Sequence, residues 1–267
     1  MAAKIFRLSI VNKTFCFCRW DECNHIASKP KEDLSGERYT NLKVKAEPES
    51  LLIGIDGRCN LNCRQCRKEF SIYDDVEKSM LACQRYRILD SKWMNKAKSL
   101  TFASYGEVFF SPIYKSLLFD VEKGLKRNSI SILSNGILFS EEYFQMLKEH
   151  YDKISVSVSV DAACGETYNI VRGGNWERLN KNLKNLVAHR KKGEIESIVL
   201  TFCTQLCNMK EIYEFIEYAR NLEVDGVRFQ KIHYTEDMTI DEFEEVFSLT
   251  DRFGGGKKRS SGNTCEC

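Results

Sequence analysis

Three cysteines in one short segment carry the strongest chemical signal in this 267-residue chain. Cys59, Cys63 and Cys66 follow the spacing CxxxCxxC. Thiolates are the usual ligands of iron-sulfur clusters, and a four-iron cluster is normally held by four of them. Three thiolates would leave one iron with an open position, the feature that separates catalytic metal sites from closed structural ones. The same spacing is compatible with a zinc knuckle or with buried thiols, so the surrounding elements must decide.

Further polar residues suited to ligand binding follow the cysteines at intervals. Glu107 offers a carboxylate to a cationic amine, and its neighbour Gly106 lets the backbone approach a ligand closely. Arg172 offers a two-pronged donor to a carboxylate. The other candidates lie at the ends of predicted strands: Asn135, Ser159 and Asp161. Each of these residue types also serves in ordinary turns and helix caps, so their joint order is the more specific signal.

Six segments rich in Ile, Val, Phe and Leu alternate with longer segments whose apolar residues recur at helical spacing. The predicted strands are 51–56, 99–103, 129–134, 154–160, 197–204 and 226–232, and predicted helices between them include 141–151, 176–192 and 209–222. Repeated strand-helix units predict parallel strands joined by right-handed crossovers. We therefore expect an α/β fold, a partial (βα)6 TIM-like barrel, with ligands at the carboxyl ends of the strands.

The predicted barrel occupies residues 51–250. Residues 1–50 are predicted as a cysteine-containing extension and linker, and residues 251–267, with three consecutive glycines, as a flexible tail. Asn208 with Glu211 is typical of a capping box at a helix start, and Thr239 with Glu242 repeats the signal for a last helix.

With these motifs in place, the chain resembles the radical S-adenosylmethionine (radical SAM) superfamily, whose defining loop is CxxxCxxC on a partial (βα)6 barrel. The resemblance covers roughly residues 51–232 and implies a [4Fe-4S] cluster on Cys59, Cys63 and Cys66, with SAM on the open iron. It also implies that one electron cleaves SAM to methionine and a 5'-deoxyadenosyl radical, which removes hydrogen from the substrate. Gln65 stands where the family usually has an aromatic residue, a departure common in the SPASM and twitch branch, which is closest in motif style.

The same resemblance assigns roles to the other candidates. Gly106 and Glu107 match the segment that binds the methionine amino group, and Asn135 matches a family turn. Ser159 and Asp161 are similar to residues that face the ribose. Arg172 matches a residue that pairs with the methionine carboxylate. A reducing partner such as flavodoxin or ferredoxin is implied as well.

The formal net charge of +2 favours neither nucleic acid nor membrane as partner, and a small molecule or peptide is expected instead. No secretory signal or segment of about 20 apolar residues is present, so we expect a cytoplasmic protein. Cytosolic thiols stay reduced, which favours metal binding over disulfides for clustered cysteines.

The cysteines and histidines outside the loop give weaker signals. An auxiliary iron-sulfur cluster is one interpretation of five of them: Cys16, Cys18, Cys23, Cys265 and Cys267. Most of a second group are expected to be buried small side chains: Cys83, Cys164, Cys203 and Cys207. Cys164, Cys203 and Cys207 could instead lie near the active face. The histidines show no metal-ligand spacing and fit surface or helix-end positions: His25, His150, His189 and His233.

Three functional classes remain open at this point. The leading one is a radical SAM enzyme acting on a peptide or a sugar-linked metabolite. The second is a non-catalytic iron-sulfur electron carrier or scaffold on the same fold, and the third is a zinc-binding interaction module. The Gly106-Glu107 and Arg172 motifs favour the first class, whereas the substrate cannot be read from shared initiation chemistry.

Overall fold

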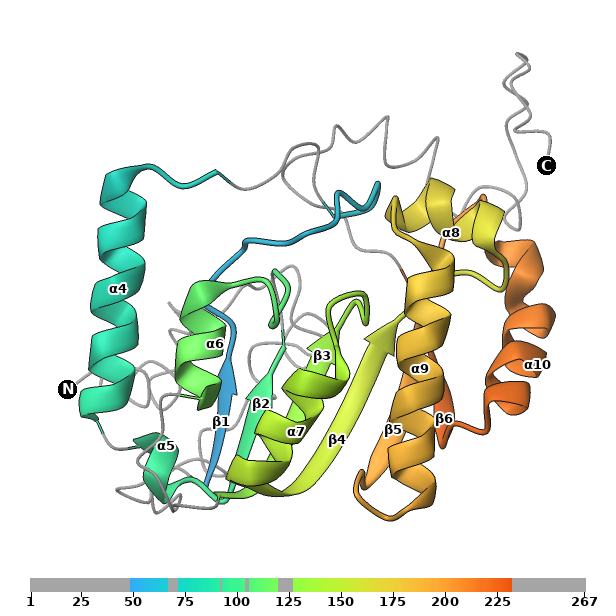
Figure 1. The fold of residues 1–267 in the computed structure, drawn as a ribbon. Coiled ribbons are helices and arrows are strands. Elements are labelled where there is room, and N and C mark those ends of the chain that lie inside the picture. The colour runs from blue at the N-terminus through green and yellow to red at the C-terminus, as the bar shows by residue number, and fades with distance from the viewer. Residues whose placement is uncertain (1–48, 67–71, 92, 104–105, 120–126, 232–267) are drawn as a thin grey trace, which may run out of the picture. The chain divides into compact units, whose positions relative to one another are not determined.

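The computed structural model describes residues 49–66, 72–91, 93–103, 106–119 and 127–231 (Figure 1). Residues 1–48 of the predicted N-terminal extension, the predicted tail and the helix start predicted at Thr239 lie outside these residues.

Six strands form one parallel sheet in chain order, with β1 and β6 at its two ends. The strands are β1 (Ser50–Ile53), β2 (Ser99–Phe102), β3 (Arg127–Ser134), β4 (Tyr151–Ser159), β5 (Ser197–Thr204) and β6 (Gly226–Lys231). Each pairs with the next in parallel register, as in Ile132 with Val156 of β3 and β4. The predicted six-unit partial barrel is confirmed, and the sheet does not close.

Helices connect the strands, and in the view of Figure 1 α6, α7 and α9 lie in front of the sheet. The described helices are α4 (Asp75–Asp90), α5 (Trp93–Lys96), α6 (Pro112–Phe119), α7 (Glu141–His150), α8 (Gly165–Arg172), α9 (Trp176–Lys191), the 3-10 turn η2 (Met209–Glu211) and α10 (Ile212–Leu222). The predicted helices 141–151 and 176–192 are confirmed to within one residue. The predicted helix 209–222 is η2 followed by α10.

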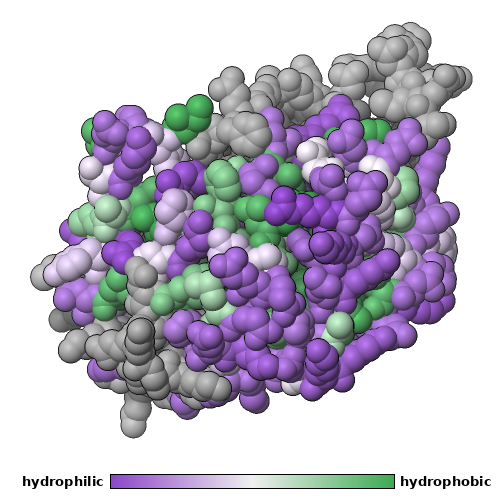
Figure 2. Space-filling model, viewed as in Figure 1, coloured by the Kyte–Doolittle hydropathy of each residue, from purple (hydrophilic) through white to green (hydrophobic). Residues whose placement is uncertain are grey.

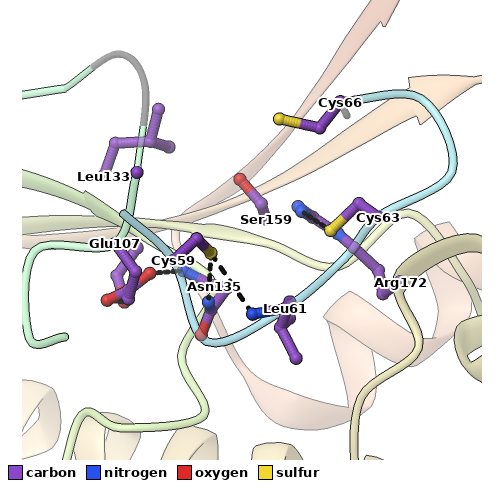
Figure 3. Close-up of a pocket in the computed structure, with 11 residues that line it drawn as sticks. Cys59, Leu61, Cys63, Cys66, Glu107, Leu133, Asn135, Ser159 and Arg172 are labelled. Carbon is purple, nitrogen blue, oxygen red and sulfur yellow. Dashed lines mark hydrogen bonds between the residues drawn. The ribbon is translucent and has the colours of Figure 1, made fainter. Parts of the chain in front are cut away.

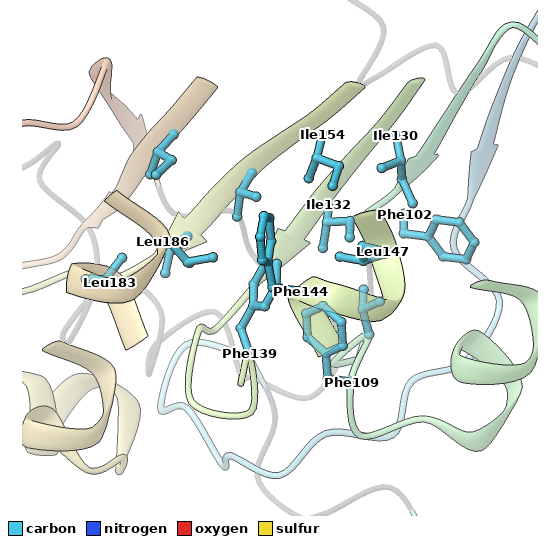
Figure 4. Packing of buried hydrophobic residues seen from close by; sticks show 14 of the residues in the cluster. Phe102, Phe109, Ile130, Ile132, Phe139, Phe144, Leu147, Ile154, Leu183 and Leu186 are labelled. Carbon is cyan, nitrogen blue, oxygen red and sulfur yellow. The ribbon is translucent and has the colours of Figure 1, made fainter. Parts of the chain in front are cut away.

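The alternation of residues in β4 shows how the sheet is packed. Ile154, Val156 and Val158 are buried and face the helices, whereas the serines between them are half-buried on the other face. Figure 4 shows Phe144 and Leu147 of α7, together with side chains of α9, in the apolar layer next to these strands. Burial of this layer fixes which face of each strand meets the helices.

The capping box predicted at Asn208 is wrong, because its side chain bonds elsewhere. Asn208 forms no side-chain cap. Its Oδ1 accepts from the Gln205 amide at 2.7 Å, and its Nδ2 donates to the carbonyls of Asp161 and Cys203, each at 2.9 Å. Asn208 therefore ties the end of β5 to the end of β4.

A capping box that the sequence interpretation missed starts α4. The Glu77 amide donates to Asp74 Oδ1 at 2.8 Å, and the Asp74 amide donates to Glu77 Oε2 at 2.9 Å. This reciprocal pair satisfies two donors at the helix start.

The outer surface of the helical layer is largely hydrophilic in the view of Figure 2. Within the described residues, none of the helices combines the length and the apolar character needed to cross a membrane.

Candidate active site

The segment after β1 brings its three cysteines to one cavity of about 100 Å³ at the carboxyl ends of the strands (Figure 3). Most predicted site residues share this cavity: Cys59, Cys63, Cys66, Gly106, Glu107, Asn135, Ser159 and Arg172. The thiols are spread around it, and among the described residues no three His, Cys, Asp or Glu side chains gather tightly enough for a single metal ion. Asp161 is not among the lining residues.

Nitrogen donors already point at two of the three sulfurs. Cys59 Sγ lies 3.4 Å from the Leu61 amide and 3.6 Å from Asn135 Nδ2. Cys63 Sγ lies 3.3 Å from Arg172 Nη1. Such donors stabilise the negative charge of thiolates, the form in which cysteine binds metals. The donor set therefore fits an iron-sulfur cluster.

A buried carboxylate holds the start of the cysteine loop. Asp56 is fully buried, forms a 2.6 Å ion pair with Arg58, and accepts a hydrogen bond from the Ser111 hydroxyl. Its backbone amide donates to the Tyr114 hydroxyl at 2.8 Å. Burial opposes ionisation, but the Arg58 and Ser111 hydrogen bonds hold the pKa of Asp56 below its ordinary value. The loop is thus anchored on α6 three residues before Cys59.

Gly106 contacts the cysteine loop directly. It adopts φ of +83°, and a Cβ added there would lie 2.2 Å from the Asp56 carbonyl oxygen and 2.7 Å from that of Arg58. The next amide, of Glu107, donates to the Arg58 carbonyl at 2.8 Å. Glycine is needed here for backbone contact with the loop, while the predicted approach to a ligand remains a proposal.

Glu107 bridges the loop after β2 to the turn after β3. Its carboxylate accepts from the Ser134 hydroxyl and the Asn135 amide, each at 2.7 Å. Burial raises the pKa of Glu107 above its ordinary value, an effect that these hydrogen bonds oppose. Asn135 is thereby fixed where its side chain reaches both Cys59 and, at 2.9 Å, Asn60 Oδ1.

Arg172, the last residue of α8, faces two anionic partners. Its Nε lies 3.0 Å from Asp161 Oδ2, and its Nη1 lies 3.3 Å from Cys63 Sγ. Burial alone would lower the pKa of the guanidinium, but Asp161 and Cys63 together raise it above its ordinary value. Arg172 therefore stays positively charged beside the cysteine loop.

The prediction that most of the other cysteines are buried is wrong for the four that the structure describes. Cys83, in α4, and Cys164, just before α8, are exposed, whereas Cys203, near the end of β5, and Cys207, in the loop after it, are half-buried. Burial raises the pKa of the Cys203 thiol to about 12. The five cysteines considered for an auxiliary cluster lie outside the described residues.

His189 sits at a helix end as predicted, yet it is largely buried. It lies in the last turn of α9 between Glu194, 2.6 Å from Nδ1, and Glu141, 2.9 Å from Nε2. His150 likewise ends α7. His25 and His233 lie outside the described residues.

Sequence reasoning missed two residues that shape the site. The apolar pattern places Asp56 only at the end of a strand, although an acid two residues before Arg58 and three before Cys59 is a usable signal. Gln65 was noted as a departure from the aromatic type, but its 2.9 Å hydrogen bond to Asp161 spans 96 positions and leaves no local pattern.

Comparison with known families decides the assignment. Residues 55–219 match the model of the radical SAM superfamily, which is more than half of the chain. The chain belongs to the radical SAM superfamily. Members of this family use a [4Fe-4S] cluster and SAM, in agreement with the predicted cofactors.

Two curated relatives match part of this radical SAM chain. A probable GTP 3',8-cyclase of Methanococcus aeolicus is 30% identical over 203 residues, which cover 73% of this chain and 62% of the relative. The antilisterial bacteriocin subtilosin biosynthesis protein AlbA of Bacillus subtilis is 28% identical over 167 residues, covering 62% of this chain and 35% of AlbA.

Solved structures of SuiB from Streptococcus suis share the fold. The complex with SAM aligns with a TM-score of 0.54 at 14% identity, and the complex with the precursor peptide SuiA with 0.52 at 15% identity. These alignments cover 88% and 87% of this chain, but 52% and 53% of the SuiB chains. AlbA and SuiB belong to the SPASM and twitch branch, as the motif style predicted.

The radical SAM chain thus spans 62% of the cyclase, 35% of AlbA and about half of SuiB.

Proposed function

We propose that this chain reductively cleaves SAM and uses the product radical to abstract hydrogen from a substrate. The single observation that carries the proposal is the convergence of Cys59, Cys63 and Cys66 on one cavity that also contains Arg172 and Asn135. When bound there, a reduced [4Fe-4S] cluster supplies the electron that splits SAM into methionine and a 5'-deoxyadenosyl radical.

The residues of the chain would hold the cluster and orient the cofactor. Cys59, Cys63 and Cys66 supply three thiolates, and the donors on the first two favour the anionic sulfur. Ser159, which accepts a 3.2 Å hydrogen bond from Thr201, presents a half-buried hydroxyl suited to a ribose. Gly106 and Glu107 line the cavity and would face the methionine end of SAM, with Glu107 acting mainly by fixing Asn135.

We propose that Arg172 binds the carboxylate of SAM while it keeps its contacts with Asp161 and Cys63. Its guanidinium has further N–H groups beyond those near Asp161 and Cys63, and these suit the carboxylate of SAM. Asp161 does not line the cavity, so we assign it to positioning Arg172 rather than to the ribose.

A peptide is the substrate class we favour of the two expected. AlbA takes part in the biosynthesis of a bacteriocin, and a SuiB structure holds a precursor peptide. Both relatives extend well beyond the region that this chain covers. A flavodoxin or ferredoxin remains the proposed electron donor.

Anaerobic reconstitution tests the proposal. Wild type should take up about four irons and four sulfides. With dithionite and SAM it should form 5'-deoxyadenosine, measured by liquid chromatography and mass spectrometry. Replacement of Cys59, Cys63 and Cys66 together by Ala should abolish both, whereas Cys83→Ala, at an exposed cysteine of α4, should change neither.

The outcome separates the three functional classes. A full cluster without 5'-deoxyadenosine, whose electron paramagnetic resonance spectrum is unaltered by SAM, would favour the electron carrier or scaffold. Zinc without iron would favour the interaction module. Iron retained by the triple variant would report a second cluster on other cysteines.

A further inference from the structure

Asp161 contacts residues from three segments around the site, although it does not line the cavity. It is 2% exposed and adopts φ of +61°, which is unusual for a residue other than glycine. Its Oδ1 accepts from the Cys203 amide at 2.6 Å. Its Oδ2 lies 2.9 Å from Gln65 Nε2 and 3.0 Å from Arg172 Nε. One carboxylate thus joins the ends of β4 and β5, the cysteine loop and the end of α8.

Backbone bonds hold this carboxylate in position. The Asp161 amide lies 3.3 Å from the Thr201 carbonyl, and its own carbonyl accepts from Asn208 Nδ2 at 2.9 Å. The strained backbone, the two hydrogen bonds to the carboxylate and the ion pair with Arg172 leave Asp161 little freedom to turn toward another partner. A residue held in this way can define the position of whatever pairs with it.

The Gln65 amide is oriented by this contact. The Asp161 carboxylate lies beside the Arg172 cation and accepts the hydrogen bond, so the amide nitrogen of Gln65 faces Asp161. The opposite atom, Oε1, is buried and has no hydrogen-bond partner among the described residues. The bond to Asp161 is thus the contact that holds the Gln65 side chain, and it does so one residue before Cys66.

Arg172 connects Asp161 to Cys63, one of the proposed cluster ligands. With Nε against Asp161, the guanidinium plane directs Nη1 to Cys63 Sγ at 3.3 Å. The three loop sulfurs are not equivalent in this respect: the donors described at Cys59 are neutral, and the donor at Cys63 is a cation. A hydrogen bond and a positive charge at a ligand sulfur stabilise the reduced form of an iron-sulfur cluster and raise its reduction potential.

We propose that Gln65 and Asp161 are positioning residues that hold Arg172 on the Cys63 sulfur, and that this contact raises the reduction potential of the cluster. The inference rests on the proposed function, because it requires a cluster on the loop cysteines. It goes further in giving Arg172 a role that does not depend on SAM and in giving Gln65 a role at all.

The test is an electrochemical titration of the reconstituted full chain without SAM, followed by electron paramagnetic resonance. Arg172→Lys keeps the charge, but a single ammonium cannot match the fixed fork that spans Asp161 and Cys63, so the midpoint potential should move to a more negative value. Gln65→Leu keeps both charges and should cause a smaller shift in the same direction. Gln145→Leu is the matched control, since Gln145 donates to the carboxylate of Glu141 on the exposed side of α7, and it should leave the potential unchanged.

The double variant separates positioning from a general structural effect. If Gln65 acts through Arg172, Gln65→Leu should add no further shift in the Arg172→Lys background. Potentials of Gln65→Leu and Arg172→Lys equal to wild type, or fully additive shifts, would overturn the inference. Should Arg172→Lys fail to load iron, the potential of Gln65→Leu alone decides between a shift and none.

The proposed function can fail separately from this inference. A loaded cluster whose potential responds as described, but which yields no 5'-deoxyadenosine with SAM and dithionite, would refute the cleavage and leave the positioning role standing. A wild-type chain that takes up no iron would refute both.

Discussion

At the scale of single residues, the site depends on a few backbone positions that no other residue type can occupy. Gly106 combines positive φ with contact to the backbone oxygens of Asp56 and Arg58. These oxygens belong to the segment that leads into Cys59, so a side chain at residue 106 would displace the cysteine loop. Gly193 shares the positive φ, at +76°, but has no atom within 4 Å of the Cβ position.

This pair of glycines gives a matched test. Gly193→Ala should cost about 1 kcal/mol in the free energy of unfolding, the effect of left-handed backbone alone. Gly106→Ala should cost roughly 2–4 kcal/mol, because the loop must also move, and should reduce iron uptake on reconstitution. Urea denaturation and iron analysis measure the two effects. Equal costs and normal iron uptake in both variants would show that the Gly106 contact does not hold the loop.

At the scale of elements, a cluster of charges ties α7 to the end of α9. His189 lies between Glu141 and Glu194, and its ring centroid lies 3.9 Å from that of Phe144. Lys148 of α7 forms an ion pair with Glu194. The Lys148 and His189 hydrogen bonds lower the pKa of Glu194 from 4.5 to about 2.

The lowered pKa of Glu194 predicts a specific dependence of stability on pH. Since the folded-state pKa lies below the unfolded value, the stabilisation is present above about pH 4.5 and is lost as the pH falls towards 2. Glu194→Gln should therefore flatten the decline in melting temperature between pH 5 and pH 3, relative to wild type. Glu142→Gln, at an exposed neighbour in the first turn of α7, should keep the wild-type slope. Parallel slopes for wild type and Glu194→Gln would contradict this assignment.

The elements also show what the sequence could predict. Strand β4 could be predicted because Ile154, Val156 and Val158 alternate with serines. Helix α9 could be predicted because its apolar residues recur at helical spacing. Helix α4 has no such apolar stripe, since Leu81 is its buried residue and most of the others are exposed. The signal in its sequence is the capping box at its first turn. Helix α8 is only eight residues long, begins at Gly165 and is followed by Gly173, so its sequence indicates a motif rather than a helix.

At the scale of the whole molecule, the residues that line the cavity were predictable and the residues that support them were not. The cysteine loop, Glu107, Asn135 and Ser159 lie at the carboxyl ends of β1 to β4, which a parallel fold brings together, and Arg172 ends α8 in the connection after β4. The contact of Arg172 with Cys63 joins residues 109 positions apart, and its geometry depends on Asp161. Such pairings arise from packing, so the sequence predicted a ribose contact for Asp161 where the structure has a partner of Arg172.

The same architecture separates stability from chemistry. Leu147 of α7 is fully buried in the layer between sheet and helices, whereas the cavity lies at the strand ends. Leu147→Ala should lower the free energy of unfolding by about 2–5 kcal/mol through the cavity that it leaves. Leu52→Ala, at a β1 side chain that is 71% exposed, should change it by no more than about 0.5 kcal/mol. Urea denaturation measures both, and iron content and 5'-deoxyadenosine per folded molecule should equal those of wild type. Loss of iron from folded Leu147→Ala would show instead that packing of the helical layer sets the geometry of the cysteine loop.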